Sequence, residues 1–247
     1  MRKIKYLVTI IALFAILLPH PVSTQNESEK LLSETFSGKT AILNELFNAK
    51  KEVLMNMYGF TDFDFIPTIV NLEKQGVEVK MILEEAPYQS ETENFDIRSM
   101  LKNYGIEVRW ARSEFFLDHA KYIVIDDTEA IVLTGNFTYS SFTKNREFGL
   151  VTTDKGKVTT LRNLFYADFN RTDISNDNDN VLISPVDSRA KIENALRSAT
   201  KSIKIWEQTV DDPTIVNILK AQKAKGVDVK VLMPASYAGD LAKSLGD

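Results

Sequence analysis

Hydrophobic and polar residues alternate with two different periods from residue 52 onward. Short apolar runs with a two-residue period predict β-strands, and longer stretches with an apolar residue at every third or fourth position predict helices. The predicted strands are 52–58, 76–83, 106–110, 122–125, 130–134 and 147–152, and the predicted helices are 65–75, 94–104 and 158–169. Strands that alternate with helices indicate an α/β fold, with a mixed or largely parallel β-sheet flanked by helices.

Two polar stretches frame this alternation. Residues 25–34 are polar and carry no predicted element, and residues 170–180 read NRTDISNDNDN, a composition typical of a linker. Beyond the linker the chain begins again. Three segments recur in the same order: 41–53 as 191–203, PTIVN at 67–71 as 213–217, and GVEVK at 76–80 as GVDVK at 226–230.

Three matches in the same order indicate an internal duplication. The spacing between the last two segments is longer in the second copy, by about one helical turn. We therefore predict one complete unit at 35–170, a linker at 171–182, and the first part of a second unit at 183–247.

The first 24 residues predict a signal peptide. Arg2, Lys3 and Lys5 precede an apolar stretch at 6–18, and prolines and small residues follow it. This stretch is shorter than the roughly 20 residues that span a bilayer. We therefore expect a secreted or cell-envelope protein, with an uncleaved anchor or a buried hydrophobic helix as the alternatives.

Composition narrows the chemistry. The chain has no cysteine, which excludes disulfides, thiolate metal sites and cysteine nucleophiles. Its formal charge of −4 becomes −7 without the three basic residues of the leader. That acidity argues against a non-specific nucleic-acid coat, but it is compatible with a local basic groove. Of the two histidines, His20 lies in the predicted leader, which leaves His119.

His119 stands in the segment DHAKYIVIDDTEAIVLTGN, where polar groups surround two short apolar runs. His119 and Lys121 are two residues apart, so on a strand their side chains share one face. A neutral imidazole is a good nucleophile near neutral pH because its ordinary pKa is about 6.5. The pair therefore suits attack on phosphorus by one group while the other neutralises a phosphate oxygen.

The same segment resembles the H-x-K-x4-D-x6-G-S-x-N signature of the phospholipase D superfamily. Four positions of this signature are in register, namely His119, Lys121, Asp126 and Asn136. Leu133 and Thr134 stand where the signature has glycine and serine, and the threonine keeps a hydroxyl. Residues 143–147 (TKNRE) also resemble bacterial endonuclease-like members, and the resemblance covers roughly residues 35–247.

The resemblance implies a phospholipase D-like fold and a phosphodiesterase that hydrolyses or transfers a phosphodiester through a phosphohistidine on His119. Lys121, Thr134 and Asn136 are then expected to bind the phosphate, and Glu147 to hold the second ring nitrogen of the histidine. Asp126 belongs to the catalytic signature, but we expect it to organise the turn rather than act on the substrate. No cofactor is implied, and the sequence shows no metal-binding cluster.

Phospholipids are the expected substrate class, with a membrane surface as a further partner. An endonuclease acting on nucleic acid and an inactive remnant or binding protein are the alternatives. The segment 115–117 (FFL) is expected to form core or pocket wall, with a substrate-facing apolar patch as the alternative, and Trp110 is expected to pack.

In the superfamily, two motifs face each other and the second histidine protonates the leaving alcohol. The sequence has no histidine after His119, and the second copy stops before the corresponding position. We expect that the second motif comes either from a missing C-terminal half or from a second chain. The unfinished repeat favours the first of these.

Overall fold

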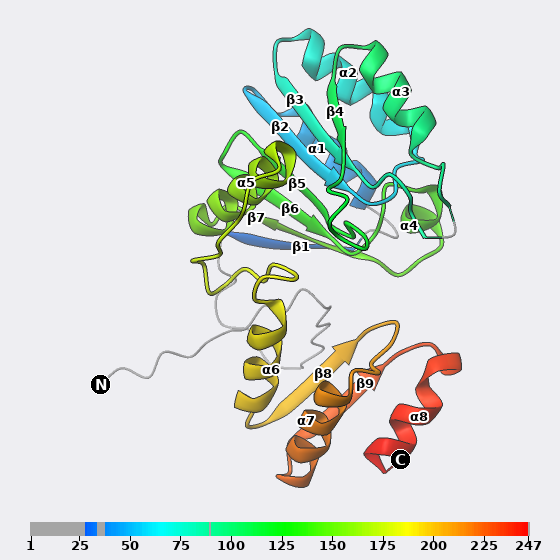
Figure 1. The fold of residues 1–247 in the computed structure, drawn as a ribbon, viewed down its shortest axis with the longest axis vertical. Helices are drawn as coiled ribbons and strands as arrows, with labels where there is room; N and C mark the ends of the chain where they lie inside the picture. The colour runs from blue at the N-terminus through cyan, green and yellow to red at the C-terminus, as the bar shows by residue number, and fades with distance from the viewer. Residues whose placement is uncertain (1–27, 34–37, 89, 247) are drawn as a thin grey trace. The chain divides into compact units, whose positions relative to one another are not determined.

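The computed structural model describes residues 28–33, 38–88 and 90–246. The predicted signal peptide lies outside these residues and stays a prediction. The chain forms two compact units, and the boundary along the chain falls between residues 178 and 179, inside the predicted linker (Figure 1). Among the described helices, none combines the length and the apolar character needed to cross a bilayer.

A seven-stranded mixed sheet forms the centre of the first unit (Figure 1). Strands β2, β3 and β4 run parallel, whereas β5 pairs with β2 in the antiparallel direction and is followed by antiparallel β6, β7 and β1. The strands, in sheet order, are β1 Glu29–Ser33, β7 Phe148–Thr152, β6 Glu129–Leu133, β5 Lys121–Ile125, β2 Glu52–Met57, β3 Glu78–Leu83 and β4 Glu107–Trp110. All residues of β2 and β5 are buried, as expected for two strands in the interior of the sheet.

Helices cover both faces of this sheet (Figure 1). On one face, Val53 and Met55 of β2 pack in the same core as Ile42 and Ile97, which belong to two different helices. On the other face, the Tyr166 hydroxyl donates a hydrogen bond of 3.0 Å to the Glu52 carboxylate. The helices of the first face are α1 Lys39–Phe47, α2 Ile66–Lys74 and α3 Phe95–Asn103, and α5 Lys155–Asn170 covers the second. Short α4, Tyr139–Thr143, follows β6.

Strand β1 is a departure from the sequence prediction, which placed no element at 25–34 and began the unit at 35. The strand escapes the hydrophobic pattern because it lies at the edge of the sheet and pairs with β7 alone. Of the side chains that the structure describes there, only Leu32 is buried, and Leu31 is exposed. An edge strand of this kind keeps polar residues, so its composition resembles that of a loop.

The second unit contains three helices and a two-stranded parallel sheet. Its elements are α6 Ser188–Ser198, β8 Ser202–Trp206, α7 Pro213–Ala224, β9 Asp228–Leu232 and α8 Ala235–Leu245. Five side chains form its buried core, namely Leu196, Ile203, Ile218, Leu219 and Val227. This order of elements repeats the order α1-β2-α2-β3-α3 of the first unit.

The strand registers of the two units also agree. Glu52 of β2 pairs with Glu78 of β3, and Ser202 of β8 pairs with Asp228 of β9, so both pairs join residues 26 positions apart. Helix α7 has 12 residues against 9 in α2, where the 3-10 turn Phe63–Phe65 precedes the helix. The structure therefore accounts for the longer spacing in the second copy.

Candidate active site

Tyr58 holds the histidine and the lysine of the motif together. His119 lies just before β5 and Lys121 begins it, and the imidazole meets the Tyr58 ring edge-on with 4.4 Å between centroids. The ammonium of Lys121 lies 5.1 Å from the centroid of the same ring and donates a 2.8 Å hydrogen bond to the His119 carbonyl oxygen. The two groups therefore lie side by side at the end of β2, as the two-residue spacing predicts.

Burial shifts the pKa values of both groups. His119 is exposed as a residue, yet partial desolvation of its ring, followed by the positive charge of Lys121, lowers its pKa to about 4. Burial also lowers the pKa of Lys121 to about 8, against the opposing effects of Glu147 and Asp118. At neutral pH the imidazole is therefore neutral and nucleophilic, while most of the ammonium stays charged.

A buried carboxylate fixes the loop that carries the histidine. Asp118 accepts hydrogen bonds from the Asn56 side chain at 2.9 Å and from the Ala120 amide at 3.2 Å. Its own amide donates to the Glu84 carboxylate at 2.7 Å. Desolvation raises the pKa of Asp118, against the effect of these donors. Sequence reasoning missed all three side chains, although one signal was available: Asn56 is a polar residue in the middle of an apolar strand.

Asn94 ties a second loop to the same end of the sheet. Its side chain is fully buried. It accepts a hydrogen bond from the Phe60 amide and donates to the carbonyl oxygens of Tyr58 and Glu84, each at 2.8 Å. This single amide joins the ends of β2 and β3 to the start of α3. The sequence gives no local sign of this role, because the bonds span up to 36 residues.

Asn136 reaches the site beside Gly59. A Cβ atom added to Gly59 would lie 2.6 Å from the Glu93 carboxylate and 3.3 Å from the Asn136 amide group, so both side chains pack directly against the glycine. The Oδ1 atom of Asn136 is buried and has no hydrogen-bond partner among the described residues. Leu133, at the expected glycine position, is buried in β6, which explains why an apolar residue is suitable there.

Thr134 and Glu147 form a pair. The Thr134 hydroxyl donates a 2.7 Å hydrogen bond to Glu147 and accepts one of 2.9 Å from the Phe148 amide. Thr134 was expected to bind phosphate and Glu147 to hold the histidine ring. In the structure Glu147 instead accepts from Thr134 and, at 3.3 Å, from Asn145. No hydrogen bond joins Glu147 to His119 within the described part of the chain.

Asp126 lies at the other end of β5. It follows the last residue of the strand, whereas His119 precedes the first, so about seven residue steps, roughly 20 Å, separate the two. Its carboxylate accepts hydrogen bonds from the amides of Lys50 and Lys51 at 2.7 Å and of Glu52 at 3.0 Å. The structure therefore places the Asp126 carboxylate at the opposite end of β5 from His119, in contact with the backbone amides that lead into β2.

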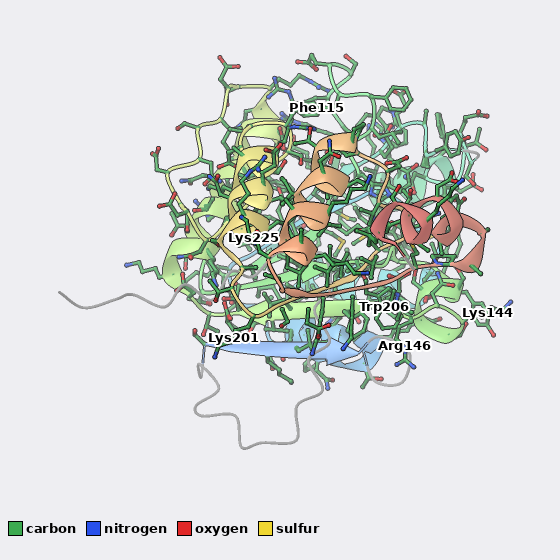
Figure 2. All side chains as sticks on the ribbon, turned by 90° about the horizontal axis from the view of Figure 1, so that it is seen from below. Phe115, Lys144, Arg146, Lys201, Trp206 and Lys225 are labelled. Atoms are coloured by element: carbon green, nitrogen blue, oxygen red, sulfur yellow. The ribbon has the colours of Figure 1, made fainter. Side chains whose placement is uncertain are left out.

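The segment 115–117, expected to form core or pocket wall, is not fully buried at any of its three residues. Phe116 is 94% exposed, and Phe115 is half-buried with the Arg112 guanidinium 5.5 Å from its ring centroid. Figure 2 marks Phe115 in its loop ahead of β5. An apolar side chain is thus presented to solvent three residues before His119.

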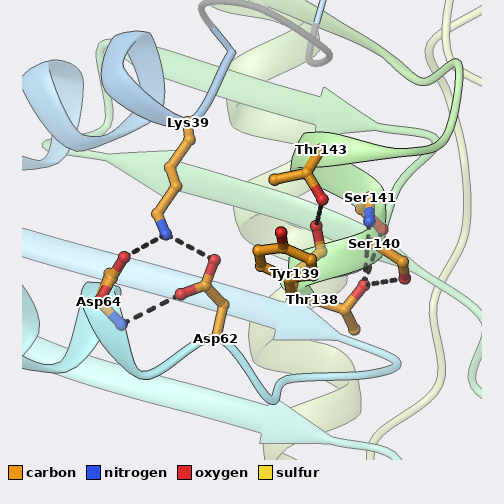
Figure 3. A network of polar contacts seen from close by, with 8 residues as sticks. All are labelled: Lys39, Asp62, Asp64, Thr138, Tyr139, Ser140, Ser141 and Thr143. Atoms are coloured by element: carbon orange, nitrogen blue, oxygen red, sulfur yellow. Dashed lines mark hydrogen bonds and ion pairs between the residues drawn. The ribbon is translucent and has the colours of Figure 1, made fainter.

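A polar network supports the loops around Asn136 (Figure 3). The Lys39 ammonium pairs with Asp62 at 2.7 Å and with Asp64 at 2.6 Å. The Asp62 amide in turn donates to the Phe137 carbonyl oxygen at 2.9 Å. The Thr138 hydroxyl caps α4 by accepting from the backbone. These contacts link α1, the loop after β2 and the loop after β6.

No metal site is evident among the described residues, which contain no group of three or more His, Cys, Asp or Glu side chains that could hold an ion.

The fold and this site define a phospholipase D-like protein. Residues 42–169, just over half of the chain, match the family described as "Cardiolipin synthase, PLD-like domain". The chain therefore belongs to this family of the phospholipase D superfamily, which confirms the resemblance noted in the motif.

Two curated relatives are similar to the chain. The DISARM protein DrmC of Bacillus paralicheniformis is 23% identical over 128 residues, which are 50% of this chain and 53% of the relative. A phospholipase D of Rickettsia typhi is 24% identical over 107 residues, which are 43% and 50% of the two chains. The chain thus spans about half the length of the curated relatives that it matches.

Solved structures confirm the predicted fold class. Nuc, a phospholipase D family member from Salmonella typhimurium, aligns with a TM-score of 0.54 and 24% identity over 58% of this chain and 94% of Nuc. The phosphatidylserine synthase of Haemophilus influenzae aligns with a TM-score of 0.67 and 15% identity over 85% of this chain and 62% of the synthase. At these identities the likeness shows the fold alone.

Proposed function

We propose that this chain is a phosphodiesterase of the phospholipase D type, with His119 as its nucleophile. The observation that carries the proposal is the pairing of His119 and Lys121 on the Tyr58 ring. One member of the pair is unprotonated at neutral pH and the other is largely protonated. This is the arrangement that attack on an anionic phosphodiester requires, because the nucleophile needs its lone pair and the phosphate needs a positive charge.

In the proposed reaction, an imidazole nitrogen of His119 attacks phosphorus and the bond from phosphorus to the leaving oxygen breaks. Lys121 and the Asn136 amide stabilise the oxygens that gain charge. Water, or an alcohol in a transfer reaction, then attacks the phosphohistidine and regenerates the imidazole. The Thr134 hydroxyl contributes indirectly here, because it positions Glu147 close enough to act on the charge of Lys121.

The leaving oxygen needs a proton, which the resemblance assigns to a second histidine. In the part of the chain that the structure describes, His119 is the only histidine. The proposal therefore includes a proton donor on a second motif, carried by a further segment or by a second chain. Such general acid assistance typically contributes about 10²–10⁴-fold to the rate.

Phospholipid is the substrate that we propose first. Phe116 supports it, because an exposed phenyl ring three residues from the nucleophile suits contact with an apolar or interfacial surface. The negative formal charge of the whole chain also disfavours a general affinity for nucleic acid.

Nucleic acid is the second candidate, and a different observation favours it. Lys144 and Arg146 are both exposed on the segment between α4 and β7, next to Glu147 (Figure 2). Cations in this position suit the phosphates that flank a scissile bond in a polymer.

Three substrates assayed side by side test these proposals: bis(p-nitrophenyl) phosphate, phosphatidylcholine vesicles and plasmid DNA. We expect His119→Ala to abolish turnover, and the matched surface variant Lys50→Gln to keep it. Phe116→Ser should lower vesicle turnover and leave the chromogenic ester unaffected if lipid is the substrate. If Lys144→Gln and Arg146→Gln each lose plasmid cleavage, nucleic acid is supported as the substrate instead. Unchanged turnover in His119→Ala would contradict the assignment of the nucleophile. Absence of turnover with all three substrates favours a binding protein or inactive remnant.

A further inference from the structure

A groove of about 570 Å³ lies along the edge of the first unit, between α3 and β4. Strand β4 is the last strand of the sheet on this side. The side chains that give the groove its chemistry are Arg98, Lys102, Arg109, Trp110 and Arg171. Four of these five carry a positive charge, in a chain whose formal charge is negative.

Of the four cations, Arg109 alone forms an ion pair with a carboxylate in the described part of the chain. Arg109 donates to the Glu107 carboxylate at 2.7 and 3.1 Å and to the Phe169 carbonyl oxygen at 2.6 Å. Arg171 donates at 3.3 Å to a carbonyl oxygen, that of Trp110, which carries no formal charge. Arg98 and Lys102 form no ion pair with any residue that the structure describes. Without a bound ligand, the groove therefore has an excess of positive charge.

Arg98 is held in a position suited to bind a ligand. Its guanidinium lies 4.4 Å from the centroid of the Trp110 ring. Its Nε atom is buried and has no hydrogen-bond partner among the described residues. Stacking thus fixes the plane of the guanidinium, while none of its donors is used by a described residue. Leaving such a group unsatisfied costs free energy, and an anion that accepts from its edge would recover it.

We propose that this groove binds a phosphate group, separate from the one that His119 attacks. A fixed guanidinium fork matches two oxygens of a phosphate, and the nearby ammonium of Lys102 adds a point charge. Helix α3 begins directly after Asn94, so Arg98 and Lys102 lie one and two turns beyond that side chain, about 6 and 12 Å along the helix axis. Arg98 therefore lies about one helical turn from the side chain that ties α3 to the candidate active site.

Tryptophan fluorescence tests this proposal without any need for turnover. The chain has two tryptophans, and Trp206 belongs to the second unit, so Trp206→Phe leaves Trp110 as the only reporter. Titration of this protein with pyrophosphate should give a saturable change in the emission of Trp110. Added salt should weaken the binding, because the attraction is between charges.

Two matched double variants locate the binding site. Arg98→Gln with Lys102→Gln should raise the Kd for pyrophosphate about tenfold or more, since both charges that face the phosphate are lost. Lys50→Gln with Lys51→Gln removes the same charge from an exposed segment before β2 and should leave the Kd unchanged. The single variant Lys102→Gln leaves the Arg98–Trp110 contact intact and should give a smaller rise in the Kd. It serves as a control for a change in the fold caused by loss of that contact.

A third variant separates this site from the candidate active site. Lys121→Met should abolish any phosphate binding beside His119 and leave the signal of Trp110 unchanged. Loss of that signal in Lys121→Met, equal weakening in both double variants, or no saturable change would each overturn the proposal. If oligothymidylate displaces pyrophosphate, the bound phosphate group belongs to a nucleic acid, and if soluble short-chain phosphatidylglycerol displaces it, the group belongs to a lipid. If neither displaces it, the site binds a free phosphate ion.

Discussion

The two units contain the same α-β-α-β-α segment, but they bury it differently. In the first unit, Leu54 and Ile82 point from β2 and β3 into a face that is fully covered. At the same register positions in the second unit, Lys204 is half-buried and Leu232 is 56% exposed. The same strand pair and helices therefore occur in two environments that differ in burial.

The two units also differ in the neighbours of their first matching strand, β2 in one unit and β8 in the other. In the first unit β2 pairs with β5 on one side and β3 on the other, and β5 begins with Lys121. Among described residues 179–246, β8 pairs with β9 alone. Every side chain of the candidate active site belongs to the first unit. The shared scaffold therefore positions the site, while the strands added at the edge of β2 carry reactive side chains such as Lys121.

The sharpest test of this comparison is the loss of one cation from each unit. Lys121→Met should lower kcat/KM by about 10²–10³-fold, because it removes a charge that stabilises the transition state. Lys230→Met, which alters an exposed lysine of β9 paired with Asp228, should have no effect on turnover. Steady-state kinetics with the chromogenic phosphodiester measure both. Similar losses in the two variants would show that the second unit also contributes to the reaction.

The pH dependence should report only groups of the first unit. His119 must lose a proton to attack, so kcat/KM should fall about tenfold per pH unit below its pKa of about 4. Lys121 must keep its proton, so kcat/KM should fall in the same way above a pKa of about 8. Lys121→Arg should remove the basic limb, because arginine does not deprotonate in this range. Persistence of that limb in the arginine variant would assign it to another group.

A pair of glycines extends the comparison to packing. Gly59→Ala places a methyl group 2.6 Å from the Glu93 carboxylate and 3.3 Å from the Asn136 amide, so Glu93 must shift, and we expect about a tenfold loss of kcat/KM from misplacement of the amide. Gly239 lies inside α8 with open space around it. Gly239→Ala should raise the free energy of unfolding by about 0.5–1 kcal/mol and leave activity unchanged. Full activity in Gly59→Ala would argue against a role for Asn136.

Another expected effect concerns a position that differs between the two copies. Gln222 of α7 occupies the position of Leu72 in α2, and its amide donates at 2.8 to 3.1 Å to the carbonyl oxygens of Leu196, Arg197 and Ala199. Gln222→Leu leaves these acceptors at the end of α6 unsatisfied and should cost about 1–3 kcal/mol of stability. Urea unfolding measures it, with Leu72→Met as the volume-conserving control. An unchanged midpoint would mean that water replaces the lost bonds.

Much of the fold could be predicted from hydrophobic periodicity. Strands β2, β3, β4, β5, β6 and β7 lie within two residues of the predicted bounds, because buried strands carry long apolar runs. Strand β1 was missed, because an edge strand with one buried side chain lacks that pattern. Helix α4 was missed because five residues are too short for a helical period to be recognised.

The site was only partly predictable, for a different physical reason. The two-residue spacing was enough to predict that His119, just before β5, and Lys121, its first residue, lie together. Tyr58, Asn56 and Asn94 reach the same place through contacts that span 30 to 62 residues, and no local pattern encodes those contacts. The role expected for Glu147 came from resemblance, and in the structure this carboxylate bonds to Thr134 instead.

Asp126 gives the motif an unexpected meaning. Its carboxylate gathers three backbone amides at one end of β5, while His119 lies at the opposite end. The number of residues between His119 and Asp126 is therefore set by the length of strand β5, and not by the size of a catalytic pocket. A residue inserted between them would change which face of the sheet each end presents. The distance from His119 to Asp126 then reflects a packing requirement: one end of β5 is anchored by Asp126, so that the residues at its other end stay aligned with the site.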